Sequence, residues 1–95
     1  MKNLEIENCH VSALRITNLE DSNVSLKNIS TYSMDLRDSK IDKLLMDHVT
    51  TRSKLKYDDA QVKDLKSSNV FFGKNLKIWN EGSNIEIKPD KILDE

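Results

Sequence analysis

Apolar residues recur at every fifth position along most of this 95-residue chain. The series starts at Leu4 and, after one extra residue near Lys54, resumes at Leu55. Thirteen of its fourteen positions are apolar in a chain that is 37% apolar overall. A fixed period of this kind indicates a repeat architecture, in which short units stack on their neighbours and share one core. The members of this first series are Leu4, Cys9, Leu14, Leu19, Val24, Ile29, Met34, Ser39, Leu44, Val49, Leu55, Ala60, Leu65 and Val70.

A second series begins two residues after the first, at Ile6, and ten of its fourteen positions are apolar. Residues two apart lie on the same face of a strand, so each pentad reads as a short extended segment followed by an outward corner. Whether the whole second series faces inward stays open at this stage. A helix is the alternative for residues 34–48, but five-residue spacing would spread apolar side chains around every helical face.

The residue before each member of the first series is often Asn or Asp. These residues tolerate unusual backbone angles and bond their own neighbouring amides, so they favour tight corners. The chain therefore carries a corner signal with the same period as its apolar signal. The positions are Asn3, Asn8, Asn18, Asn23, Asn28, Asp38, Asp59, Asp64 and Asn69, and Asn75 and Asn84 precede apolar residues beyond the end of the series.

The local strings 17–19, 22–24, 68–70 and 83–85 read Thr-Asn-Leu, Ser-Asn-Val, Ser-Asn-Val and Ser-Asn-Ile. They resemble the pentapeptide-repeat family, whose loose consensus is Ala-(Asp/Asn)-Leu followed by two variable residues. The resemblance implies an all-β fold, a right-handed, four-sided parallel β-solenoid with four pentads in each coil. We expect about 3.5 to 4 coils in a single domain, residues 1–95. Residues 2–74 would form the solenoid, and residues 75–95 would form a C-terminal coil and cap.

The five-residue spacing loosens after Gly73. Residues 76–78 and 85–87 predict two short strands, with residues 79–84 turning between them. Pro89 is expected to end the second strand, because proline cannot donate to the ladder. The C-terminus is therefore expected to form a lid over the last coil.

Aromatic side chains are concentrated near this lid. We expect Phe71, Phe72 and Trp79 to cluster there, with Ile92 and Leu93 folding back over the core in a last turn at residues 90–95. The alternative is that Trp79 or Phe71 is exposed and anchors a partner, because aromatic anchors dominate protein interfaces.

The N-terminal end has no segment that looks like a cap, since the pattern is already in register at Lys2. Terminal repeats need covering. Either the chain is a piece of a longer solenoid or a second copy covers the first coil end to end. The candidate interface residues are Leu4, Ile6, Leu14, Ile16, Phe71 and Trp79.

Residues suited to catalysis or metal binding are few. His10 and His48 are expected at different corners, where they do not meet, and Cys9 is expected to be a small buried residue. As the only cysteine, Cys9 excludes an internal disulfide. The chain has two glycines and no glycine-rich phosphate loop. We therefore expect no catalytic residues, no metal and no cofactor, and we do not expect an enzyme.

Charge is abundant but balanced, with 16 acidic and 15 basic residues interleaved along the chain. Interleaving argues against direct nucleic-acid binding, because a basic block is the usual sign of it. The sequence holds neither a signal-peptide pattern nor an apolar run long enough to span a membrane. We expect a cytoplasmic protein that makes no membrane contact.

These features predict a non-catalytic protein-interaction module that binds a protein partner, with homodimers or end-to-end self-association. The resemblance includes small bacterial or phage inhibitors that act on nucleic-acid-handling or defence complexes. Some of these imitate duplex DNA, which requires regularly spaced negative charge. To do so, this chain would need its Lys and Arg residues segregated to one side. The alternative is a structural scaffold segment of a larger bacterial protein, such as a secreted effector.

Overall fold

The computed structural model describes residues 2–94, which form a stack of parallel β-strands without any helix. The sheet order is β1-β2-β3-β4-β6, and β5 pairs with β3. This is the expected all-β parallel solenoid, although it has about 5 turns rather than about 3.5 to 4. Met1 and Glu95, the ends of the expected domain, lie outside the described residues. The strands are β1 (Lys2–Arg15), β2 (Ser22–Asp35), β3 (Lys40–Lys56), β4 (Gln61–Phe72), β5 (Lys77–Trp79) and β6 (Lys91–Ile92).

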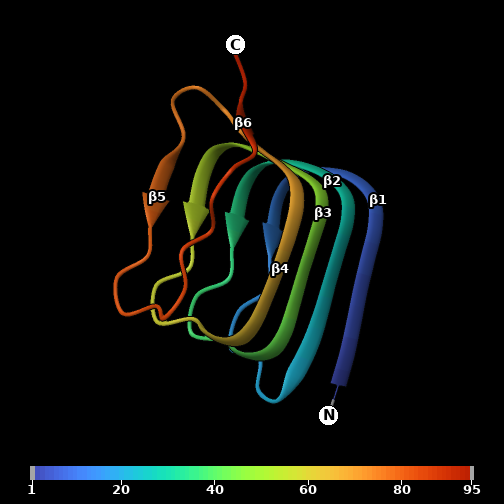
Figure 1. Ribbon diagram of the computed structural model, residues 1–95, viewed down its shortest axis with the longest axis vertical. Helices are drawn as coiled ribbons and strands as arrows, with labels where there is room; N and C mark the ends of the chain where they lie inside the picture. The colour runs from blue at the N-terminus through green and yellow to red at the C-terminus, as the bar shows by residue number, and fades with distance from the viewer. Residues whose placement is uncertain (1, 95) are drawn as a thin grey trace.

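Each long strand bends over, so that one coil is a flattened loop with two limbs (Figure 1). The chain runs along a first limb, crosses an arch and returns along a second limb before the next coil begins. The second limb of the fourth coil is continued by β5, which pairs with the end of β3. The first limb comprises residues 2–7, 22–27, 41–47 and 61–68, and the second limb comprises residues 10–15, 30–37, 50–57 and 71–79.

Strand pairing follows the column expected from a 20-residue coil, with Leu4 opposite Val24 and Val24 opposite Leu44. From β3 to β4 the offset becomes 21, with Leu44 opposite Leu65. The extra residue near Lys54 is a β-bulge, because the register jumps between Thr31–Thr51 and Ser33–Lys54. The predicted insertion is therefore confirmed, and it lies on the second limb.

Both apolar series face the interior. In the second coil Val24 and Leu26 are fully buried, as are Leu44 and Met46 in the third. The possibility that part of the second series faces outward therefore does not hold for the central coils. Residues 34–48 contain no helix but the end of β2 and half of β3. The continuous core consists of Ile16, Val24, Leu26, Ile29, Met34, Leu36, Ile41, Leu44, Met46, Val49, Leu55, Tyr57, Ala60, Val62, Val70, Phe72 and Ile87.

Ser39 is the one polar member of the first series, and it is buried. Its hydroxyl donates to the Ile16 carbonyl at 3.3 Å and accepts the Leu19 N–H at 3.2 Å. A buried hydroxyl without such partners would lose its bonds to water at a cost of about 1–3 kcal/mol. Ser39 is tolerated inside because it bonds to the backbone of the coil below.

The expected corner residues divide into two kinds. Asn8, Asn18, Asn28 and their equivalents in later coils have positive φ, whereas Asn3 and Asn23 do not. Asn or Asp thus recurs about every five residues in the sequence, whereas positive φ recurs about every ten residues in the backbone. Each coil has one left-handed residue at the arch and one at the opposite turn. The remaining members of this set are Asp38, His48, Asp59 and Asn69, and all seven have φ between 55° and 59°.

Replacing Asn28 by alanine or by glycine separates the backbone cost of this conformation from the side-chain contact. Both variants remove the amide that donates to Asn8 at 2.7 Å. Only alanine bears a Cβ at φ 55°, so we expect Asn28→Ala to be less stable than Asn28→Gly by about 1 kcal/mol. Urea unfolding followed by circular dichroism measures the difference, and equal stabilities would show that the corner carries no backbone strain.

The C-terminal end differs from the expected pair of strands. β5 forms where the first was expected, and a turn follows in which the backbone N–H of Ser83 donates to the Asn80 carbonyl at 3.2 Å. Residues 85–87 form no strand, and the second short strand is β6, which follows Pro89 and pairs with Phe71 and Phe72. Pro89 thus precedes a strand rather than ending one, because the chain returns to the ladder only after crossing the coil.

The lid is held by a buried tyrosine. Ile87 is buried, and its N–H donates to the Tyr57 hydroxyl at 3.1 Å. This bond comes from a stretch without strand pairing, so it fixes the chain across the open coil. Ile92, which was expected to fold back over the core, is 58% exposed. Ile87 therefore takes the covering role expected of Ile92.

Removing the Tyr57 hydroxyl tests this lid. Tyr57→Phe leaves the buried Ile87 N–H without its acceptor, so we expect a loss of about 1–2 kcal/mol. Amide hydrogen exchange at Ile87 should accelerate more than exchange in β2. Tyr32→Phe is the matched control, because Tyr32 is exposed. Equal effects of the two variants would contradict the lid.

Candidate interaction surfaces

The N-terminal coil forms an open end of the stack. β1 pairs only with β2, so one edge of this 14-residue strand faces no other strand among residues 2–94. Its inward side chains are half-buried, and Val11 is 36% exposed. The equivalent residues one coil later are buried, for example Val24 above Leu4. Unpaired edges with apolar flanks are sites where another chain can add.

The predicted interface residues fall into two groups. Leu4, Ile6 and Leu14 lie at this open end and are half-buried. Ile16 is 5% exposed and belongs to the core against which they pack. The remaining two, Phe71 and Trp79, lie elsewhere on the solenoid.

The three aromatic residues of the expected C-terminal cluster lie in three places. Phe72 faces the core, and Phe71, its neighbour on the strand, lines an outer groove. Trp79 is 39% exposed on β5, with the Lys56 ammonium 5.3 Å from its ring centre. The cluster does not form, because successive residues of a strand point to opposite faces.

A groove of about 340 Å³ lies across the arch of the four long strands, β1 to β4. His10 and His48 both line it, together with Cys9 and Phe71. The expectation that the two histidines lie at different corners is therefore wrong. Both flank one inward column, because His10 follows Cys9 and His48 precedes Val49, and these two residues are aligned through Ile29.

Asp47 is the most connected acid at this arch. Its Oδ1 accepts from the Ser68 hydroxyl at 3.1 Å and the Asn69 amide at 3.4 Å, and lies 2.8 Å from Nδ1 of His48. The hydrogen bond from Asn69 and those from Ser68 and His48 lower the pKa of the Asp47 carboxyl, against an opposing effect of desolvation. Among residues 2–94 no three His, Cys, Asp or Glu side chains are arranged to hold a metal ion.

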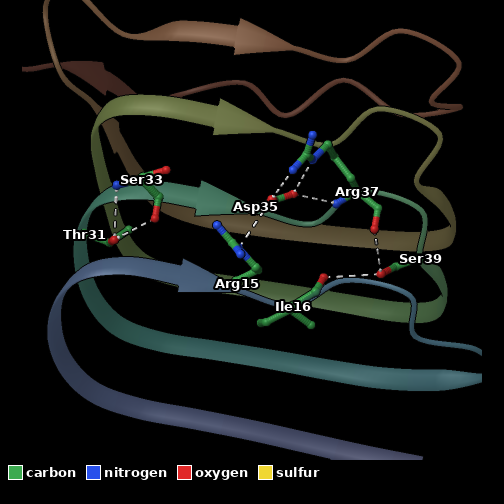
Figure 2. Close-up of polar contacts among 7 residues, drawn as sticks. All are labelled: Arg15, Ile16, Thr31, Ser33, Asp35, Arg37 and Ser39. Carbon is green, nitrogen blue, oxygen red and sulfur yellow. Dashed lines mark hydrogen bonds and ion pairs between the residues drawn. The ribbon is translucent and has the colours of Figure 1, made fainter.

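Asp35 is a buried carboxylate that joins the first two coils (Figure 2). Its two oxygens accept from Nε and Nη2 of Arg37 at 2.9 and 2.8 Å, and the Arg37 N–H adds a third bond at 3.1 Å. Arg15, at the end of β1, lies 3.8 Å away on the opposite side. The side-chain hydrogen bond from Arg37 is the main cause that lowers the pKa of Asp35, and burial opposes it.

This lowered pKa predicts how stability depends on pH. The Asp35 contribution is complete above the unfolded-state value near 3.8 and is lost as pH falls through the lower folded-state pKa. Asp35→Asn should therefore cost about 1–3 kcal/mol at neutral pH, and its deficit relative to the natural chain should shrink as pH falls below the unfolded-state value. Asp64→Asn, at an exposed position of β4, is the control and should change little at either pH. A deficit that does not vary with pH, measured by urea unfolding, would contradict the assignment.

The second limb concentrates basic residues in a way that the interleaved sequence concealed. Its four segments hold seven of the fifteen Lys and Arg residues but only one of the sixteen acids, Asp35. The rest of the chain therefore has eight basic and fifteen acidic residues. The seven are Arg15, Arg37, Arg52, Lys54, Lys56, Lys74 and Lys77.

Comparisons with known proteins do not indicate a function, so a function can be proposed only from the fold and from these surfaces. The chain matches no protein-family model, no curated protein and no solved structure. Between residues 2 and 94 there is no helix that is long and apolar enough to cross a membrane.

Proposed function

We propose that this chain is a non-catalytic interaction module of the pentapeptide-repeat type, and that it binds a protein through its open N-terminal end. The observation that carries the proposal is the 14-residue edge of β1, flanked by half-buried Leu4, Ile6 and Leu14. A strand added to this edge would satisfy the free backbone groups and cover these side chains.

A second copy of the chain is the partner that the proposal favours. The two ends of the stack are not alike, since the C-terminal end is crossed by residues 85–90 and the N-terminal end is not covered within residues 2–94. Pairing of two N-terminal ends about a two-fold axis gives a closed dimer, whereas end-to-tail stacking would have to displace the lid. In the alternative case of a scaffold segment within a larger protein, a preceding coil would cover this end in place of the second copy.

An inhibitor of a nucleic-acid-handling or defence complex remains within this proposal, with the open end as the binding surface. DNA imitation by the first limb gains little support. Its outward columns mix signs, as in the run of Glu7, Lys27 and Asp47 along the stack, whereas duplex DNA presents regularly spaced negative charge.

Self-association is tested by sedimentation over a range of protein concentrations. We expect a dimer that Leu4→Asp weakens by about tenfold or more, because burying an unpaired carboxylate in the interface is costly. Ser67→Asp is the matched control, because it adds the same charge in β4, near the opposite end of the stack. Ser67 belongs to the second series and is exposed. A monomer at every concentration would exclude the second copy as partner.

The single cysteine gives an independent readout. Cys9 is half-buried in the first coil, so end-to-end pairing should slow its reaction with a thiol reagent as the protein concentration rises. Leu4→Asp should abolish that protection while far-UV circular dichroism stays unchanged. Protection that persists in Leu4→Asp would place the contact elsewhere.

A further inference from the structure

We propose that the second limb carries a binding site for single-stranded nucleic acid, a role beyond the interaction at the open end. The site is a groove of about 340 Å³ on the outer face of the second limb. Basic side chains and one exposed tyrosine line it, and no acidic side chain from residues 2–94 does. The lining residues are Tyr32, Arg52, Ser53, Lys54, Gly73, Lys74, Asn75 and Lys77.

The β-bulge shapes this groove. Arg52 and Ser53 together stand opposite Tyr32, so the strand carries one residue more than its neighbour at this point. Bulges bend a strand and re-aim its side chains, and they are frequent beside functional sites. The bulge here is also the only place where the five-residue apolar series gains an extra residue. The irregularity therefore coincides with the groove rather than with a coil end.

Gly73 is required by the same feature. Its N–H donates to the Thr51 carbonyl at 2.9 Å, and a Cβ at this position would lie 2.1 Å from the Arg52 carbonyl oxygen. Any other residue would have to push the bulged backbone away. The backbone of the next coil thus closes over the bulge, and Lys74 and Asn75 follow at once in the groove wall.

The cations of this groove are held close together. Lys54 and Lys77 are directly opposite each other on β3 and β5, and like charges opposite each other on neighbouring strands are destabilising. Lys56 continues the row over the ring of Trp79. The groove therefore carries repulsion that a polyanion would relieve.

An aromatic surface beside these cations favours nucleic acid over an acidic protein. Tyr32 is 54% exposed within the lining, and Trp79 is partly exposed at the far end of the row. Proteins that bind single strands combine a positive groove for the backbone with exposed aromatic rings on which bases stack. An acidic peptide would use the charges but has no bases to stack on Tyr32. A short single strand of DNA or RNA uses both features.

Binding is measured by fluorescence anisotropy with fluorescein-labelled dT12 and U12 oligonucleotides. We expect binding to both at low salt, weakening by about tenfold or more on raising the salt to physiological strength. Trp79 is the only tryptophan, so its emission should change with unlabelled oligonucleotide. The two oligonucleotides separate a preference for DNA from one for RNA.

Matched charge reversals locate the site. Lys54→Glu and Lys77→Glu should each weaken binding by about tenfold, and Tyr32→Ala should weaken it by a similar factor through lost stacking. Lys27→Glu and Lys88→Glu make the same charge change away from the second limb and should alter affinity by less than about threefold. Unchanged thermal unfolding shows that each variant is folded, and Lys54→Ala replaces any reversal that is not.

Three outcomes would overturn the proposal. These are no binding at low salt, equal losses in the Lys27 and Lys54 variants, and binding of polyglutamate as tight as that of dT12. The last would show an unspecific anion surface. Leu4→Asp should retain oligonucleotide binding, so failure of this site and failure of the open-end interface are distinguished by the same set of proteins.

Discussion

The backbone ladder between coils is the interaction on which the rest of the structure depends. A residue of β1 finds its strand partner twenty residues later in β2, and the same holds up the stack with offsets of 19 to 23. A coil by itself therefore satisfies few of its backbone groups. Side chains are held inward only because the ladder keeps each column in register, so core and ladder form together.

A ladder of this kind has two ends, and the chain treats them differently. At the C-terminal end residues 85–89 leave the ladder and cross the coil, fixed by the bond from Ile87 to Tyr57 and by the bonds between Asp90 and Val70. At the N-terminal end one edge of β1 pairs with no other strand of residues 2–94, and half-buried apolar side chains lie beside it. The protein interaction that we propose for that end rests on the same physics that builds the interior, because adding a strand extends the ladder.

Most of the fold could be predicted from the sequence, because its two apolar series and its corner residues repeat with one period. The predictions that were wrong concern residues whose contacts do not follow the five-residue period. The lid was misplaced because Pro89 and residues 85–87 carry an ordinary strand signal. In the structure the bonds of Asn84 to Val62, Ile87 to Tyr57 and Asp90 to Val70 hold this segment instead. His10 and His48 were predicted to lie at different corners because a four-sided coil was expected. Each strand instead bends sharply at residues such as Asn28 and forms one arch between two limbs.

The sequence alone determined the repeat period and the two apolar series that could supply the core, because residues two apart share one face of a strand. It also located the extra residue near Lys54. The tertiary structure decided that the second series also faces inward in the central coils, at Leu26 and Met46. Only the tertiary structure decided how charge is distributed. Along the chain acids and bases alternate, but neighbours on the surface are twenty or more residues apart, and stacking gathers Lys54, Lys74 and Lys77 on one limb. The bulge at Arg52 and the glycine above it then turn that limb into a groove, which no local pattern specifies.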